Sequence, residues 1–258
     1  MLGAAVTFQA VGRDIVQAVD SLSAWTQRAA ALGASFVLFP EVALGDYFGG
    51  PVTVEGPEIS SLRSLAEDLH VRIGLGLGEC DGSARYSSYA LLGGRGHVAV
   101  HRKTRWQTAR CPINLGTALE AHDLCGCQAG IAICSEVREP TVSQELAAQG
   151  ARILLVPMAM GRALFPDGRT EGPSFSDFVY QHLVGVSRAT GLALVAIGAV
   201  GTRSDLEVPQ PHKDVLHGGL ALINSEGRVV SCREAETEEL FTFDLHWEGA
   251  VGSVCVLA

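Results

Sequence analysis

Apolar residues recur along this chain with two different spacings, and these spacings predict alternating helices and strands. Residues 14–32 place apolar side chains three or four positions apart before Gly33, which is typical of an amphipathic helix. Residues 58–69 repeat that pattern. Short apolar runs typical of buried strands lie at residues 3–9, 36–39, 71–77, 130–134, 153–157, 192–197 and 239–245.

Two more helices are predicted at residues 141–149 and 175–190. Two hairpins are predicted, one pairing residues 86–92 with 97–101 and one pairing 218–224 with 228–232. Residues 104–123 show no regular spacing, and their length makes them a candidate substrate loop. Strands bounded by helices, with hairpins between them, predict an α/β protein with mixed sheets covered by helices. We expect one domain over residues 1–258.

Alternation alone also fits a Rossmann or flavodoxin-like enzyme. The glycines at positions 74, 76 and 78 suit a phosphate-binding loop, but a helix should follow such a loop. Residues 79–82 look like a turn instead. We therefore do not favour a nucleotide-binding fold.

The charge balance limits the partners. With 28 acidic and 19 basic residues the net charge is −9, and no basic stripe is visible, so nucleic acid is not the expected partner. No apolar run approaches the roughly 18 residues of a membrane helix, and residues 1–11 do not resemble a signal peptide. These features predict a cytoplasmic protein with no membrane partner.

The seven cysteines form no regular framework and are odd in number, which favours reduced thiols over disulfides. Cys125 and Cys127 make a C-x-C motif. No second pair or histidine follows at ligand spacing, so a zinc site is not favoured and no metal is expected. Most of the cysteines are expected to be small core residues.

Three strand ends carry residues of complementary chemistry. Cys134 is the last residue of one predicted strand, Glu41 follows another after Pro40, and Lys103 follows a third. Only Lys103 and Lys213 among the 19 basic residues are lysines, and the pKa of lysine, unlike that of arginine, shifts readily. A nucleophile, a base and a cation are thus predicted at three strand ends.

Each of these residue types has a chemical use. A cysteine forms an acyl or thioimidate intermediate, and a carboxylate with a pKa raised by burial takes the thiol proton and later activates water. An ammonium group lowers the thiol pKa and meets the oxyanion, together with the backbone N–H of Ser135. Taken singly, Glu41, Lys103 and Cys134 also fit a turn residue, a solvated lysine and a core thiol.

Three segments resemble the nitrilase, or carbon–nitrogen hydrolase, superfamily in order and spacing. They are residues 33–41 (GASFVLFPE), 101–103 (HRK) and 130–140 (GIAICSEVREP). The likeness continues through residues 145–151 and 218–227 and so covers nearly the whole chain. The resemblance implies a four-layer α-β-β-α sandwich, a homodimer or higher homo-oligomer, and no metal or organic cofactor.

The resemblance also implies a catalytic set. By matching position, Glu41 is the general base, Lys103 stabilises the tetrahedral intermediate and Cys134 is the nucleophile. The implied substrate is a small molecule with a carboxamide, carbamoyl or nitrile group. Glu136 matches the Cys-x-Glu of nitrilases proper, whereas amidases and carbamoylases often have Cys-x-Asp, which is too small a difference to decide the substrate.

The loop after Lys103 departs from the family pattern. Many members carry a second glutamate there, and aliphatic amidases have Cys-Pro-Ile-Glu where this chain has Asn114 at the fourth position. Asparagine keeps a carbonyl acceptor but cannot take a proton. Either Asn114 or Glu120, from farther along the loop, would have to fill that place.

This departure leaves three hypotheses open. The chain hydrolyses a C–N bond, transfers the acyl group from the same cysteine to an amine, or is a catalytically silent ligand-binding protein. Because Glu41, Lys103 and Cys134 are all retained, the silent protein is disfavoured.

Further residues are candidates for the substrate pocket. Ser135 stands where the family often has a larger side chain. This difference predicts that the floor of the substrate pocket is wider or more polar. Tyr47 follows Glu41 as a Gly-Tyr often does in the family, and Trp106 and Met158 lie just beyond strand ends. All three are candidate pocket walls, although an aromatic or methionine at such a position is also typical of plain packing. His101, on the strand leading to Lys103, is expected to belong to a strand face.

Overall fold

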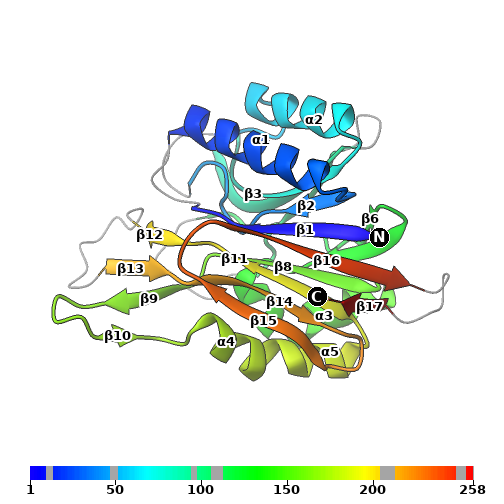
Figure 1. Ribbon diagram of the computed structural model, residues 1–258, viewed down its shortest axis with the longest axis vertical. Helices are drawn as coiled ribbons and strands as arrows, with labels where there is room; N and C mark the ends of the chain where they lie inside the picture. The colour runs from blue at the N-terminus through cyan, green and yellow to red at the C-terminus, as the bar shows by residue number, and fades with distance from the viewer. Residues whose placement is uncertain are drawn as a thin grey trace.

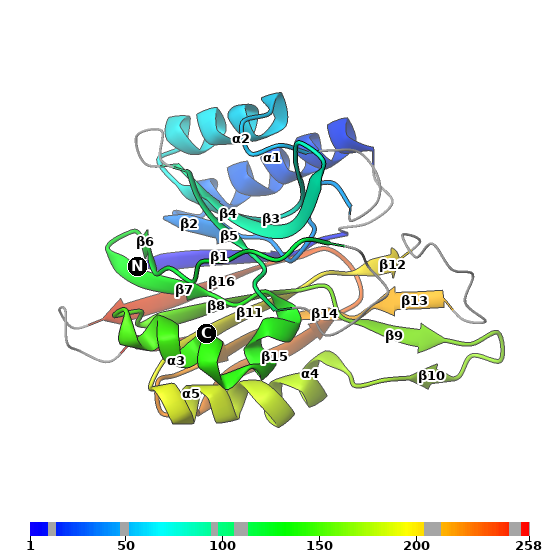
Figure 2. The ribbon, with the colours of Figure 1, turned by 180° about the vertical axis from the view of Figure 1, so that it is seen from behind.

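The structure is a computed structural model that describes residues 1–9, 14–46, 52–93, 98–105, 113–203, 213–247 and 254–257. Its elements stack in four layers, with helices on both outer sides and two sheets between them (Figure 1). Figure 2 shows the same stack from behind, with α1 and α2 on one side and α3 and α5 on the other. The predicted α-β-β-α sandwich is therefore confirmed.

Within the described residues, the first sheet has seven strands in the order β17-β16-β1-β2-β3-β4-β5. β1, β2 and β3 run parallel, and the other neighbours are antiparallel. The strands are β1 (Leu2–Thr7), β2 (Phe36–Leu38), β3 (Arg72–Asp81), β4 (Ala84–Leu92), β5 (Val98–Arg102), β16 (Glu239–Trp247) and β17 (Val254–Leu257).

The second sheet, over the same described ranges, has six strands in the order β15-β14-β11-β8-β7-β6. Its parallel centre is β7, β8 and β11, flanked by antiparallel neighbours. The strands are β6 (His122–Leu124), β7 (Cys127–Ile131), β8 (Ile153–Met158), β11 (Ala193–Gly198), β14 (Gly218–Ile223) and β15 (Val229–Ala235).

A small antiparallel sheet, which the sequence pattern did not predict, lies at one end of the stack (Figure 1). Its strands are β9 (Gly161–Leu164), β10 (Thr170–Glu171), β12 (Gly201–Arg203) and β13 (Lys213–Leu216). β9 pairs with β13, about 50 residues away, and such non-local pairing leaves no local signal in the sequence.

The helices cover the outer faces of the two large sheets. α1 (Ile15–Ala31) and α2 (Pro57–Asp68) pack on the first sheet. On the second sheet lie α3 (Pro140–Ala148), α4 (Phe175–Phe178), the π-helix η2 (Val179–Leu183) and α5 (Val184–Thr190). The single helix predicted over residues 175–190 is thus interrupted by a π-helical turn.

Alternate side chains of a strand point to opposite faces of the sheet, so β2 contributes to two separate hydrophobic cores. Phe36 and Leu38 of β2 point between the two sheets, where they join Leu155 of β8. Val37 points the other way, into the core under α1 and α2. Within the described ranges, no helix is long and apolar enough to cross a membrane.

The glycine-rich segment is a strand, not a phosphate loop. Gly76 lies in β3, and a Cβ atom added there would stand 2.3 Å from the Pro40 carbonyl oxygen and 2.6 Å from the Glu41 Cα. The backbone N–H of Leu44 donates to the Gly76 carbonyl oxygen, so the chain after β2 continues along β3. The glycine lets the turn that carries Glu41 lie directly on the strand.

Candidate functional site

Glu41, Lys103 and Cys134 follow three strands that end near one another. Glu41 lies in the turn after β2, and Lys103 comes directly after β5. The strand before Cys134 is shorter than expected, since β7 ends at Ile131 and Cys134 opens the 3₁₀ helix η1 (Cys134–Arg138). Cys134 has a φ of 51°, a left-handed conformation that costs energy in a non-glycine residue and is concentrated at functional sites.

Glu41 and Lys103 form a buried ion pair. Nζ of Lys103 donates a 2.8 Å hydrogen bond to Oε1 of Glu41, and the side chains are 1% and 2% exposed. Oε1 also accepts from the Ser87 hydroxyl at 3.2 Å, and Oε2 accepts from the backbone N–H of Ala159 at 3.1 Å. These donors fix the carboxylate between the two sheets.

The Cys134 thiol joins this pair, because it forms hydrogen bonds with the Glu41 carboxylate and with the backbone N–H of Ala159. Burial, followed by the negative charge of Glu41, raises the pKa of the Cys134 thiol to about 11. Lys103 lowers that pKa, as expected, but does not outweigh burial and Glu41. The thiol is therefore protonated at neutral pH and needs a base to become a nucleophile.

The backbone before Glu41 is held by Tyr89. The hydroxyl of this buried tyrosine on β4 donates to the carbonyl oxygen of Phe39 at 3.1 Å, and burial raises the pKa of Tyr89. The N–H of Phe39 in turn donates to the carbonyl oxygen of Gly74. Both contacts fix the chain two residues before the carboxylate.

A second buried carboxylate, Glu136, connects the segments that carry Lys103 and Cys134. Its Oε1 accepts from the N–H and hydroxyl of Thr104, and its Oε2 accepts from the N–H of Ile133 and contacts Nε2 of His101 at 2.8 Å. His101 is thus a buried partner of this carboxylate on the inner face of β5, which fits the strand-face prediction.

Other predicted pocket residues lie elsewhere. Ser135 is partly buried in η1 beside Cys134. Asn114 is exposed, and its side-chain oxygen accepts a 3.0 Å hydrogen bond from the backbone N–H of Arg85 on β4. Glu120 is also exposed. The predicted stand-ins for a second glutamate are therefore engaged or exposed at the surface.

Met158 is not a pocket wall. It is fully buried in the core between the second sheet and the helices that cover it. Alternation along β8 places it with Leu154 and Val156 on the helix side, which corrects the prediction. Tyr47 and Trp106 lie outside the described residues.

Sequence reasoning missed two groups that contact Glu41, and a third, Glu136, that contacts the residues next to Lys103 and Cys134. Ala159 contributes a backbone N–H, which leaves no signal in the sequence. Ser87 shares β4 with Arg85 and Ser88, so its polarity alone did not mark it as a partner of Glu41. The role of Glu136 shows only when β5 and η1 are brought together.

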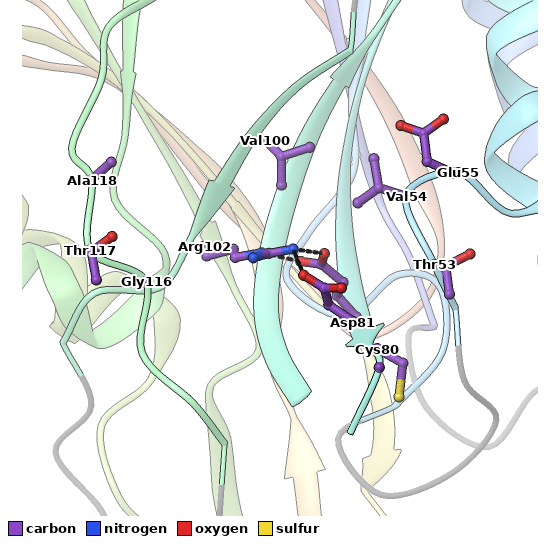
Figure 3. Close-up of a pocket in the computed structure, with 12 residues that line it drawn as sticks. Thr53, Val54, Glu55, Cys80, Asp81, Val100, Arg102, Gly116, Thr117 and Ala118 are labelled. Carbon is purple, nitrogen blue, oxygen red and sulfur yellow. Dashed lines mark hydrogen bonds and ion pairs between the residues drawn. The ribbon is translucent and has the colours of Figure 1, made fainter. Parts of the chain in front are cut away.

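The opposite face of β5 carries a separate cavity of about 610 Å³. In Figure 3, Arg102 extends across it toward Asp81, and the cavity is bounded on either side by residues 53–55 and 116–118. Arg102 binds Glu79 through Nε and a terminal nitrogen, at 3.0 and 2.6 Å, and Glu79 also accepts from Ser88. The charges that cross this cavity are thus paired with one another.

Across the described ranges, no group of three or more histidine, cysteine, aspartate or glutamate side chains could hold a metal ion. Cys125 and Cys127 differ in burial, and burial raises the pKa of each thiol.

The site formed by Cys134, Glu41 and Lys103 offers a nucleophile, a carboxylate that can take its proton, and an ammonium that can meet an oxyanion.

Comparisons with known proteins find one family that matches the sequence and one fold that matches the structure. A model of the family described as carbon–nitrogen hydrolase matches residues 4–250. The bifunctional nitrilase/nitrile hydratase NIT4B of Nicotiana tabacum is 24% identical over 271 residues, covering 90% of this chain and 74% of that protein.

Among solved structures, an amidase variant from Nesterenkonia sp. AN1 superposes with a TM-score of 0.77 at 20% identity, covering 95% of this chain and 93% of that one. That structure shows Michael addition of acrylamide at the active-site cysteine. A carbon–nitrogen hydrolase from Helicobacter pylori G27 has a TM-score of 0.74 at 17% identity, covering 94% and 87%. At these identities, the structural likeness establishes the shared fold.

Proposed function

Because the chain belongs to the carbon–nitrogen hydrolase family, we propose that it hydrolyses a non-peptide C–N bond in a small carboxamide, carbamoyl or nitrile compound. The proposed reaction passes through a covalent intermediate on Cys134. One observation carries the proposal: the buried Glu41 carboxylate is shared between Nζ of Lys103 and the thiol of Cys134.

In the first step, Glu41 takes the thiol proton while the sulfur of Cys134 attacks the carbonyl carbon. The oxygen that becomes negative meets the ammonium of Lys103 and the backbone N–H of Ser135. Glu41 then gives its proton to the departing nitrogen, which leaves as ammonia or an amine. A thioester on Cys134 remains. With a nitrile the first adduct is a thioimidate, and one water must add to its carbon and ammonia must leave before the same thioester forms.

In the second step, Glu41 takes a proton from water and the resulting hydroxide attacks the thioester carbon. The C–S bond breaks, the carboxylic acid leaves, and Cys134 regains its proton from Glu41. The raised pKa of the thiol suits this cycle, because the proton returns to the sulfur at the end of each turnover.

A second candidate reaction transfers the acyl group to an amine in place of water. The loop after Lys103 favours it, since Asn114 stands exposed where relatives carry a carboxylate that assists the catalytic groups. Both reactions share the first step and differ only in the acceptor. Product analysis with an added amine separates them, because hydrolysis yields the carboxylic acid even with the amine present, whereas transfer yields the N-acylated amine in its place.

The test is a panel of small amides, carbamoyl compounds and nitriles assayed for ammonia release. Wild type is compared with Cys134→Ala and, as a matched control, with Cys232→Ala, which removes a partly buried thiol on β15. We expect release with at least one compound class, loss of release in Cys134→Ala, and retention in Cys232→Ala. Equal release by wild type and Cys134→Ala would show that the cysteine is not the nucleophile.

We also propose that the chain assembles as a homodimer or larger homo-oligomer in the cytoplasm. The support is the family resemblance, since members of this fold commonly extend their sandwich by pairing. Sedimentation velocity at micromolar concentration tests the assembly, and a monomer at all concentrations would contradict it. Cell fractionation tests the location.

A further inference from the structure

We propose that Glu136 is a positioning residue that fixes the placement of Lys103 relative to Cys134. The inference rests on the proposed function and deepens it, because it assigns a role to a carboxylate that takes no part in the reaction steps. Glu136 is fully buried, and its carboxylate contacts four donor groups on two separate segments.

The two segments are the ones that carry the reacting groups. Thr104 directly follows Lys103, and its N–H and hydroxyl lie 2.6 and 2.8 Å from Oε1 of Glu136. Ile133 directly precedes Cys134, and its N–H lies 2.8 Å from Oε2. One rigid carboxylate therefore joins the residue after the ammonium to the residue before the nucleophile.

The contacts of Glu136 connect the two sheets, which are the central layers of the molecule. Lys103 and Thr104 extend from β5, at the edge of the first sheet, whereas Ile133 leads from β7 of the second sheet into η1. His101 adds a second contact from β5 to Oε2 of Glu136 at 2.8 Å. Relative sliding of the two sheets at this point would break contacts with both carboxylate oxygens.

Helix capping explains only part of this arrangement. A glutamate at the third position of a helix commonly accepts from the N–H before the helix, and the bond from Ile133 fits that role. Capping does not require the contacts with His101 and Thr104. Those three contacts, all to the other sheet, are what the positioning role predicts.

The contacts also require a charged acceptor. A carboxylate accepts at both oxygens, whereas a glutamine has one oxygen and one donating NH₂ group. In Glu136→Gln, that NH₂ group would face either Thr104 or Ile133, both of which donate through backbone N–H groups. Glu136→Gln would then lose the hydrogen bonds at one of the two side-chain oxygens, with almost no change in side-chain volume.

The test compares Glu136→Gln with Glu79→Gln. Glu79 is also a buried carboxylate, but it binds Arg102, the neighbour of Lys103, on the opposite face of the sheet. Both variants are checked for folding by circular dichroism and thermal unfolding. The readouts are kcat and KM on the best panel substrate, and the pH dependence of Cys134 alkylation by iodoacetamide, followed by mass spectrometry of the Cys134 peptide.

We expect Glu136→Gln to lower kcat by about 10- to 100-fold with KM nearly unchanged, because a misplaced catalytic group slows chemistry more than binding. We expect its alkylation curve to move to higher pH, since Lys103 no longer stabilises the thiolate as well. Glu79→Gln should lose thermal stability but keep the wild-type kcat and alkylation curve. If the two variants lose similar stability and show the same kcat and curve, the role of Glu136 is structural only.

A milder pair of variants covers the case in which Glu136→Gln fails to fold. Thr104→Val removes one hydroxyl bond to Glu136, and Thr104→Ser keeps it. We expect Thr104→Val to change kcat and the alkylation curve in the same direction as Glu136→Gln, and serine to recover most of the difference. Equal behaviour of valine and serine would overturn the inference.

The alkylation curve keeps this inference distinct from the proposed function. If no panel substrate is turned over, the proposed function fails, yet the thiol still reports on how Lys103 is placed. A shifted curve in Glu136→Gln together with an unshifted curve in Glu79→Gln would then still support positioning by Glu136.

Discussion

Nζ of Lys103 lies 2.8 Å from Oε1 of Glu41, and both side chains are almost completely buried between the two sheets. A buried ion pair is costly to break, because the remaining charge stays in a medium of low dielectric constant. The geometry therefore makes these two residues dependent on each other for stability as well as for chemistry.

The first prediction concerns the stability of variants that remove one or both members of this ion pair. We expect Lys103→Met and Glu41→Gln each to lower the free energy of unfolding by about 3–5 kcal/mol, since each leaves a buried charge without its ionic partner. The double variant should be more stable than either single variant, while all three lose activity. Urea unfolding measures the stabilities, and strictly additive losses in the double variant would contradict the coupling.

A second prediction concerns the reactivity of the Cys134 thiol. Burial and Glu41 raise its pKa to about 11, so the rate of alkylation should rise about tenfold per pH unit between pH 7 and 10 without a plateau. Glu41→Gln removes a charge that raises this pKa and should increase the rate at fixed pH. Lys103→Met should decrease it.

Peptide-resolved mass spectrometry isolates Cys134 from the other cysteines, and circular dichroism at each pH confirms that the protein stays folded. A plateau in the wild-type rate below pH 9 would show that the thiolate is the resting form.

The helices and strands with a regular spacing of apolar residues were predicted well from the sequence. The helix expected at residues 14–32 is α1, and the strands expected at residues 36–39 and 153–157 match β2 and β8 within a residue. These elements have strong local periodicity. The strands of the small sheet were missed because β9 and β13 are short and owe their conformation to each other.

The candidate site was predicted less completely. Glu41, Lys103 and Cys134 stand at strand ends and match family motifs, so their proximity was expected. Met158 was assigned to the wrong face, because the phase of alternation along β8 depends on where the strand meets its neighbours. The backbone N–H of Ala159 has no sequence signature at all.

The acid stability of the protein should depend on Glu136. Burial alone would raise the pKa of Glu136, but the hydrogen bond and charge of His101 and the N–H groups of Thr104 and Ile133 outweigh it and lower that pKa. A carboxyl group with a lowered folded-state pKa stabilises the fold above its unfolded pKa, and this contribution is lost as the pH falls.

We therefore expect the free energy of unfolding of wild type to fall more steeply than that of Glu136→Gln below about pH 4.5, where the unfolded carboxyl group takes up its proton. Urea unfolding from pH 6 to pH 3 measures both slopes. Parallel curves would mean that Glu136 has the same pKa in the folded and unfolded chains.

A single methyl group should displace the turn that carries Glu41. In Gly76→Ala the new Cβ meets the backbone of Pro40 and Glu41 at 2.3 and 2.6 Å, and backbone atoms cannot move aside cheaply. We expect a loss of about 1–3 kcal/mol in stability, typical of overpacking, together with loss of activity.

The matched control is Gly185→Ala in α5, where an added Cβ meets nothing within 4 Å. There the change should be neutral or add about 0.5–1 kcal/mol, because alanine is a better helix former. Full activity of Gly76→Ala would show that the site does not depend on this close approach.

The central claim is that Cys134 attacks the substrate and carries its acyl group. The most direct measurement is acid quenching of the protein during turnover of a small amide, followed by intact mass and peptide mapping. We expect a mass increase equal to the acyl group, located on the Cys134 peptide and absent in Cys134→Ala. Turnover with an unmodified Cys134 peptide, or an adduct on another cysteine, would contradict it.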